Sequence, residues 1–222
     1  MTLSTDQIDK IRWIVSHCGQ QARQMAEQQF QVFEKGVDDY VTTVDRLLDE
    51  QLLAAFTALF VEDGVITEEN TQSRAVFQQD YRRLWMIDPV DGTDDFIHGR
   101  AHYSVMVGLL EAYQPVMGWI YAPVFDRLYY GGAETGLFQV EGSAAPLPLV
   151  PTRPPAITDS HCPIIIGDKD RRRYGEAIAQ RISGAQFSSI GSFGLKVMEV
   201  VCGQAGLYVY LNGRVKLWDT TG

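Results

Sequence analysis

The sequence contains few cysteines and nothing that pairs them. Cys18, Cys162 and Cys202 are odd in number and lie far apart, so we expect reduced thiols rather than a disulfide framework or a zinc site. No run approaches the roughly 18 apolar residues of a membrane-spanning helix. Residues 1–20 carry charge throughout, without the apolar core of a signal peptide. We therefore expect a cytoplasmic protein with no membrane partner.

Positive charge is also scarce. Lys and Arg number 19 against 28 Asp and Glu, which gives a formal net charge of −9. Because nucleic-acid polymers are bound by clusters of Lys and Arg, this balance argues against such a partner. An anionic small molecule would need bound cations to neutralise part of the acidic surface. Apolar residues make up 45% of the 222 residues, a value typical of folded globular proteins.

Apolar periodicity and turn residues predict a protein of mixed helices and strands. In the first half we expect helices over about 5–30 and from about 43, separated by a loop or short extended stretch at 35–42. Strands are expected at 64–67, 84–87, 103–110, 116–121, 128–130 and 136–140. Their close spacing predicts an antiparallel meander. In the second half, strands at 163–166, 186–190 and 207–210 alternate with helices at 170–182 and 193–202.

Five prolines between residues 143 and 155 indicate a connection between two halves. We predict that residues 1–142 form helices and an antiparallel sheet that carry a metal site. Residues 143–222 are predicted to form a closely packed α/β half. Segregated helices and strands followed by alternating ones are typical of a layered α+β or mixed α/β fold.

One turn combines the groups that bind metal and phosphate. Asp88 and Asp91 are separated by a proline and Val90, so an extended turn can aim both carboxylates and the Val90 carbonyl at one point. Magnesium prefers such oxygen ligands. Gly92 and Thr93 then open a predicted helix, whose first N–H groups suit a phosphate. Taken alone, the segment could equally be a structural Asp-Gly turn.

The segment Trp85-x-Ile87-Asp88-Pro89-Val90-Asp91-Gly92-Thr93-x-x-Phe96 resembles the signature of the inositol monophosphatase superfamily. Three further segments resemble its motifs in the same order: residues 39–45 (Asp-x-Val-Thr-x-x-Asp), residues 65–69 (the metal-binding Glu) and residues 215–222 (the Trp-Asp motif). The resemblance implies an αβαβα layered fold and a lithium-sensitive, magnesium-dependent phosphatase. That superfamily includes inositol monophosphatases, 3′(2′),5′-bisphosphate nucleotidases and fructose-1,6-bisphosphatases.

The resemblance also implies a set of site residues. The metal ligands, for two or three Mg²⁺ ions, would be Glu68, Asp88, the Val90 carbonyl, Asp91 and Asp219. The catalytic residues would be Glu68, Thr93 and Asp45, with Thr93 positioning the attacking water and Asp45 hydrogen-bonded to it. The substrate-binding residues would be Asp91, Gly92, Thr93, Gly191, Ser192 and Lys196. In having a lysine at 196 and another before Leu-Trp-Asp, the sequence resembles the bisphosphate nucleotidases. An extra residue at Phe193-Gly194 departs from the family's pattern.

The substrate stays open at this stage. Inositol monophosphate and a bisphosphate nucleotide such as 3′-phosphoadenosine 5′-phosphate both fit, with a sugar bisphosphate as the alternative. A non-catalytic metal- or phosphate-binding domain on the same scaffold and a calcium-binding acidic turn are rivals. Arg171 to Arg173 could attract an anionic substrate or form a solvated helix face. A homodimer is compatible with the sequence.

The chain ends three residues after Asp219. In the resembling family the Trp-Asp motif opens a helix and more chain follows. We therefore expect a truncated C-terminal part, with a weak second metal site and a poorly covered second sheet, because chain ends fray unless they are tied down.

Overall fold

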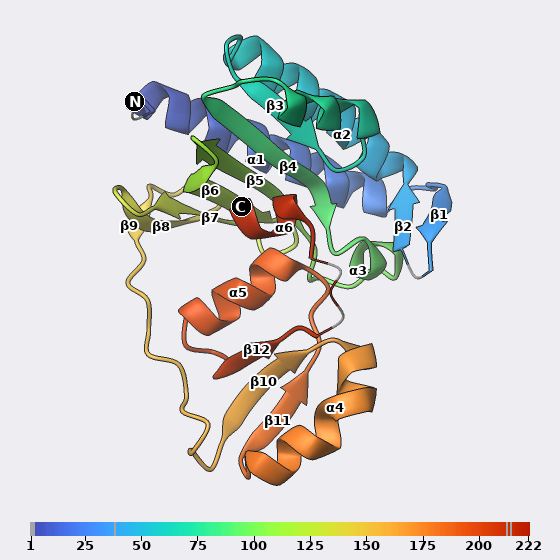
Figure 1. The fold of residues 1–222 in the computed structure, drawn as a ribbon, viewed down its shortest axis with the longest axis vertical. Helices are drawn as coiled ribbons and strands as arrows, with labels where there is room; N and C mark the ends of the chain where they lie inside the picture. The colour runs from blue at the N-terminus through green and yellow to red at the C-terminus, as the bar shows by residue number, and fades with distance from the viewer. Residues whose placement is uncertain (1–2, 38, 212, 214) are drawn as a thin grey trace.

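Helices and sheets alternate in five layers in the part of the chain that the structure describes (Figure 1). The structure is a computed structural model, and it describes residues 3–37, 39–211, 213 and 215–222. The layers are two long helices, a seven-stranded sheet, two shorter helices, a three-stranded sheet and one outer helix. This order confirms the predicted αβαβα fold of the α+β class. The division near residue 142 stays a prediction.

The two long helices each begin at a capping box. Helix α1 (Thr5–Ala26) begins where Ser4 and Gln7 bond to each other's backbone N–H groups. Helix α2 (Thr43–Leu59) begins in the same way with Thr42 and Asp45. The capping box therefore fixes Asp45 at the first turn of α2, facing the protein interior.

The apolar faces of α1 and α2 pack against the large sheet. The fully buried members of these faces include Ile11, Val15, Leu48, Leu52 and Phe56. Leu47, next to Leu48 on α2, is 39% exposed, because successive helical residues point about 100° apart. None of the described helices is at once long and apolar enough to cross a membrane.

Between these helices, β1 (Val32–Gly36) and β2 (Asp39–Thr42) form an antiparallel hairpin. The extended alternative is therefore confirmed for residues 35–36 and 39–42. The hairpin leads directly into α2, since Thr42 is both the last residue of β2 and the cap of the helix. This short connection holds the hairpin beside the ends of the central strands.

The large sheet has the strand order β3-β4-β5-β6-β7-β8-β9. Its strands are β3 (Gly64–Thr67), β4 (Arg83–Asp91), β5 (Ser104–Glu111), β6 (Gln114–Ala122), β7 (Arg127–Gly132), β8 (Gly136–Glu141) and β9 (Leu147–Pro148). The predicted antiparallel meander is confirmed from β4 to β8, and β9, which was not predicted, continues it. Strand β3 instead pairs parallel with β4, after a connection that contains the 3-10 helix η1 (Thr71–Gln78). Parallel pairing places the carboxyl ends of β3 and β4 side by side.

The second sheet has the order β11-β10-β12 and is parallel throughout. Its strands are β10 (Cys162–Ile166), β11 (Ala185–Ser188) and β12 (Leu207–Val209). Helix α4 (Asp168–Arg181) covers its outer face, and α5 (Phe193–Val201) lies between the two sheets (Figure 1). The short helices α3 (Thr93–Ile97) and α6 (Leu217–Thr221) follow β4 and precede the chain end.

Helix α6 rests on bare glycine backbone in the large sheet. Gly108 of β5 and Gly118 of β6 are paired across the sheet. A Cβ atom on Gly108 would lie 2.2 Å from the carbonyl oxygen of Thr221, and one on Gly118 would lie 2.4 Å from the carbonyl carbon of Gly222. The missing side chains therefore let α6, and Asp219 with it, lie directly against the strands.

Candidate active site

Segments far apart in the sequence converge at the carboxyl ends of β3 and β4. They line a cavity of about 180 Å³. Its lining residues are Asp39, Glu68, Asp88, Val90, Asp91, Gly92, Thr93, Lys216 and Asp219. The structure thus brings together all the residues proposed as metal ligands, and adds Thr93 and the Gly92 backbone.

The turn after β4 is shaped by a break in strand pairing. The register between β4 and β5 shifts between Asp88 and Asp91, and such a bulge turns side chains toward a new direction. The backbone N–H of Val90 donates to Asp88 Oδ1 at 3.0 Å, which closes the turn. Both carboxylates are buried, with Asp88 3% and Asp91 7% exposed.

Asp91 joins β4 to the first turn of α5. Its Oδ1 accepts from the backbone N–H of Phe193 at 2.9 Å. Its Oδ2 accepts from the N–H of Gly194 at 3.0 Å and from the hydroxyls of Ser192 at 2.5 Å and Ser104 at 3.2 Å. An ionised carboxylate offers about four acceptor sites. Oδ2 is therefore saturated, and only Oδ1 keeps room for a cation.

Thr93 and Asp45 form the predicted hydrogen-bonded pair. The Thr93 hydroxyl lies 3.1 Å from Asp45 Oδ1 and 3.1 Å from the carbonyl oxygen of Val90. A hydroxyl has one hydrogen, so it donates to one of these acceptors at a time. Asp45 is 1% exposed, and burial raises its pKa despite the hydrogen bonds that it accepts from Thr42.

Two lysines hold Glu68. The ammonium of Lys216 lies 2.7 Å from Glu68 Oε1, and that of Lys35 lies 3.2 Å from the same oxygen and 2.6 Å from Glu69. Burial acts to raise the pKa of Glu68, but the two ammonium groups outweigh it and the pKa lies below its ordinary value. Lys35 was not predicted as a site residue, because residues 32–36 contain no motif that indicates a binding site.

For Asp88 and Asp219, in contrast, favourable contacts do not outweigh the effect of burial on the pKa. Burial, followed by the charges of Glu68 and Asp91, raises the pKa of Asp88 well above its usual range. Burial is also the main reason that the pKa of Asp219 rises to about 6. Buried oxygens with excess negative charge suit a hard divalent cation. Among the described residues, no group of three acidic, histidine or cysteine side chains is arranged closely enough to hold a metal ion.

The predicted substrate corner lies against the turn from Asp88 to Thr93. Gly92 has a φ of +93°, and a Cβ atom there would lie 2.8 Å from the backbone nitrogen of Ser192, so glycine is required on both counts. Ser192 is fully buried and caps α5. Lys196 donates to the carbonyl of Gly191 at 3.0 Å, and burial lowers its pKa. Lys196 does not line the 180 Å³ cavity.

A second cavity, of about 550 Å³, lies on the other side of α3. Its walls come from α3, the first turns of α4 and the segment before α5, and it is lined by Tyr40, Asp94, Asp95, Arg100, His102, Gly167, Asp168, Lys169, Asp170, Arg172, Ser189 and Gly191. Of the three consecutive arginines, Arg172 faces this cavity. Arg171 instead lies over the Phe187 ring and Arg173 over the Tyr174 ring.

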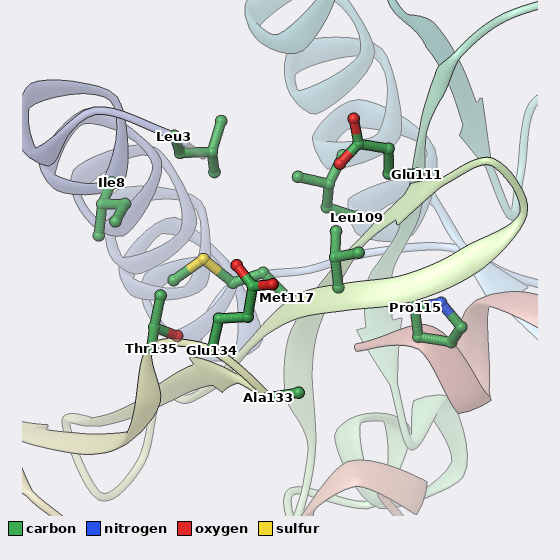
Figure 2. A pocket seen from close by; sticks show the side chains of 10 residues that line it. Leu3, Ile8, Leu109, Glu111, Pro115, Met117, Ala133, Glu134 and Thr135 are labelled. Atoms are coloured by element: carbon green, nitrogen blue, oxygen red, sulfur yellow. The ribbon is translucent and has the colours of Figure 1, made fainter. Parts of the chain in front are cut away.

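A further cavity of about 280 Å³ lies between the start of α1 and strands β5 and β6 (Figure 2). Its floor is apolar, with Leu109 and Met117 among its residues, and Glu111 and Glu134 line it (Figure 2). None of the predicted site residues lines this cavity, and it shares no residue with the 180 Å³ cavity. We therefore place the candidate site at the ends of β3 and β4.

Comparisons with known proteins place the chain in a family and support the fold. Residues 6–222 match the inositol monophosphatase family. The chain is 28% identical over 224 residues to the 3′(2′),5′-bisphosphate nucleotidase CysQ of Haemophilus influenzae, covering 100% of this chain and 81% of that protein. It is 28% identical over 196 residues to the fructose-1,6-bisphosphatase/inositol-1-monophosphatase of Aquifex aeolicus, covering 85% of this chain and 69% of that protein. A Thermotoga maritima IMPase has the same fold, with a TM-score of 0.79 at 21% identity over 97% of this chain and 79% of that one.

The layered αβαβα fold is that of the solved structure, and the match to the family and to these curated relatives makes this chain a phosphatase. The chain belongs to the inositol monophosphatase family.

Proposed function

We propose that this protein is a magnesium-dependent phosphomonoesterase that hydrolyses a 3′(2′),5′-bisphosphate nucleotide such as 3′-phosphoadenosine 5′-phosphate. The observation that carries the phosphatase assignment is the 180 Å³ cavity, which is lined by five carboxylates and by Thr93, the hydrogen-bond partner of Asp45. The proposal includes two or three magnesium ions, ligated by Glu68, Asp88, the Val90 carbonyl, Asp91 and Asp219, and inhibition by lithium. Magnesium bound there would supply positive charge for the phosphate oxygens and acidify a water.

The chain's own residues then orient and deprotonate the nucleophile. With its hydrogen donated to Asp45, the Thr93 hydroxyl keeps lone pairs that accept a hydrogen bond from the attacking water. The carboxylate of Glu68 accepts the proton of that water. The water oxygen bonds to phosphorus as the ester P–O bond breaks in line, and the leaving alcohol takes a proton. The N–H groups after Gly92 hold the phosphate in position.

The choice of a nucleotide over inositol monophosphate rests on the second cavity. Residues 92–93 line the 180 Å³ cavity and residues 94–95 line the 550 Å³ cavity, so α3 forms a shared wall. A substrate whose scissile phosphate occupies the first cavity can extend into the second. There Arg172 supplies positive charge for a second phosphate and Tyr40 supplies an aromatic face, whereas Arg100 is already paired with Asp94 and Asp95. An inositol monophosphate has no second phosphate to use them.

Phosphate release, measured with magnesium and with EDTA, tests the reaction. We expect turnover only with magnesium, and a loss of roughly 100-fold or more in kcat for Glu68→Gln. Glu50→Gln serves as the control, because Glu50 is exposed on α2 outside the cavity. Near-normal turnover of Glu68→Gln at saturating magnesium would refute the mechanism, and release that ignores EDTA would refute the metal requirement.

A matched pair of arginine variants tests the substrate. Arg172→Ala should lower kcat/KM for 3′-phosphoadenosine 5′-phosphate by roughly 10- to 100-fold, the scale of one lost charged hydrogen bond. It should leave 3′-AMP, which has one phosphate, unchanged. Arg173→Ala, whose guanidinium lies over Tyr174, should change neither substrate. Higher kcat/KM for inositol 1-phosphate than for the bisphosphate would overturn the substrate assignment and leave the phosphatase assignment intact.

A further inference from the structure

A buried carboxylate outside the candidate site holds the side chain of the residue before Glu68 and the backbone of the residue after it. Asp49 lies on the inner face of α2 and is 2% exposed. Its Oδ2 accepts from the hydroxyl of Thr67 at 2.8 Å, and its Oδ1 accepts from the backbone N–H of Glu69 at 3.1 Å. Asp49 therefore holds the residue before Glu68 and the residue after it.

Other contacts leave the backbone around Glu68 little freedom. The N–H of Glu68 donates to the carbonyl of Ile87 at 3.0 Å, which continues the β3–β4 ladder by one residue. The carbonyl of Glu68 accepts from Arg74 at 3.2 Å, and the N–H of Thr67 donates to Ser73 at 3.0 Å. Of these partners, Asp49 is the one that binds both neighbours of Glu68 with a single rigid group.

Asp49 does not itself face the 180 Å³ cavity. It lines a separate pocket with Glu50, Glu69 and Asn70, on the other side of the turn. A helix is a stiff support, and a short turn between a strand and a loop is not. The two hydrogen bonds therefore transmit the position of α2 to the Glu68 carboxylate.

We propose that Asp49 is a positioning residue for the metal site, acting through the backbone of residues 67–69 to aim the Glu68 carboxylate. This rests on the proposed role of Glu68 as a metal ligand. Residues that support metal ligands in this way change metal affinity or activity by roughly 10- to 100-fold when they are removed. Asp49 contributes geometry rather than charge, because its two oxygens are occupied by Thr67 and Glu69.

This distinction separates two substitutions. Asp49→Ala removes both acceptors. Asp49→Asn keeps both contacts, because the amide oxygen still accepts from the N–H of Glu69 and the amide NH₂ donates to the Thr67 hydroxyl, which turns to accept it. Thr67→Val removes only the hydroxyl and keeps the side-chain shape. Glu50→Ala removes the adjacent, exposed carboxylate of the same helix and is the control.

The experiment is calorimetric titration of the purified full chain with MgCl₂, paired with kcat and KM on the phosphate monoester. We expect Asp49→Ala to raise the magnesium Kd by roughly 10- to 100-fold. Asp49→Asn and Glu50→Ala should stay close to the wild-type value, and Thr67→Val should fall between. In Asp49→Ala, kcat should fall while KM for the phosphate monoester changes little. Circular dichroism in EDTA confirms folding, and if Asp49→Ala does not fold, Thr67→Val carries the same comparison.

Three results decide the matter. An unchanged Kd in Asp49→Ala and Thr67→Val would overturn the positioning role. An equal loss in Asp49→Asn and Asp49→Ala would assign the effect to charge and overturn it as well. If the wild-type chain neither binds magnesium nor releases phosphate, the proposed function itself fails. That result is distinct from a failure of the positioning role, which is judged by comparing the variants with an active wild type.

Discussion

Asp88 and Asp91 lie three residues apart at the same buried strand end, and we predict opposite effects on stability when each is changed to asparagine. Asp91 accepts four hydrogen bonds, two of them from backbone N–H groups of α5. Asp88 accepts a hydrogen bond from the backbone N–H of Val90 and faces the like charges of Glu68 and Asp91. One carboxylate is held by donors and the other is opposed by its neighbours.

The magnitudes follow from these contacts. In Asp91→Asn the amide oxygen can replace one carboxylate oxygen, but the NH₂ group then faces a backbone N–H that loses its acceptor. A buried donor left unpaired costs about 1–3 kcal/mol, and the remaining bonds lose their charge, so we expect a total loss of about 2–4 kcal/mol. Asp88→Asn keeps the bond from Val90 and removes a like charge. We expect it to raise the free energy of unfolding by on the order of 1 kcal/mol.

The assay is urea unfolding followed by circular dichroism at pH 8 in EDTA, with Glu50→Gln as the control for a surface carboxylate, which should stay within about 0.5 kcal/mol of wild type. Saturating magnesium should stabilise the wild-type chain by mass action, and both asparagine variants should lose much of that gain. A loss of stability in Asp88→Asn as large as that in Asp91→Asn would refute the reasoning, because it would mean that both carboxylates are held by donors.

Three further predictions concern other parts of the molecule. Gly108→Ala should destabilise the chain by about 1–3 kcal/mol, because the new Cβ would meet Thr221 at 2.2 Å. Gly175→Ala in α4 should instead stabilise it by up to about 1 kcal/mol, because alanine has the higher helix propensity. Thermal unfolding of the two variants separates these effects. Thr93→Val should lower kcat roughly 100-fold or more with little change in KM, and a proportionate rise in KM would contradict its role in placing water. Burial raises the pKa of Cys18 from 9.0 to about 11, so the folded state retains this proton longer than the unfolded state. The contribution of Cys18 to the free energy of unfolding is therefore fully present below pH 9. Above pH 9 it falls by up to about 1.4 kcal/mol per pH unit. Urea unfolding at pH 8 and pH 10.5 should show a smaller alkaline loss of stability in Cys18→Ala.

Local chemistry explains what the sequence could predict. Caps, turns and apolar spacing are set by neighbouring residues, so most helices and strands were placed within a few residues of their bounds. The turn from Asp88 to Thr93 was recognisable because its spacing and its glycine have local reasons. Strand direction has no such local sign: the periodicity of residues 64–67 and 84–87 could not reveal that β3 and β4 run parallel.

Contacts made by tertiary structure were beyond this reach. Lys35 and Lys216 meet at Glu68 across 33 and 148 residues of chain, and an ion pair leaves no pattern over such distances. Asp49 did leave a signal. It falls with Leu48 and Leu52 on the buried face of α2, and a carboxylate at such a position needs buried partners.

The bonds of Asp91 have a consequence for how metal and substrate act on each other. Asp91 is a proposed metal ligand, and it also accepts hydrogen bonds from the first turn of α5. Gly191, two residues before that helix, lines the larger cavity. A ligand that shifts the start of α5 therefore shifts Asp91, and a cation that draws in Asp91 shifts α5. Linkage requires such coupling to be reciprocal, so the factor by which metal tightens substrate binding equals the factor by which substrate tightens metal binding.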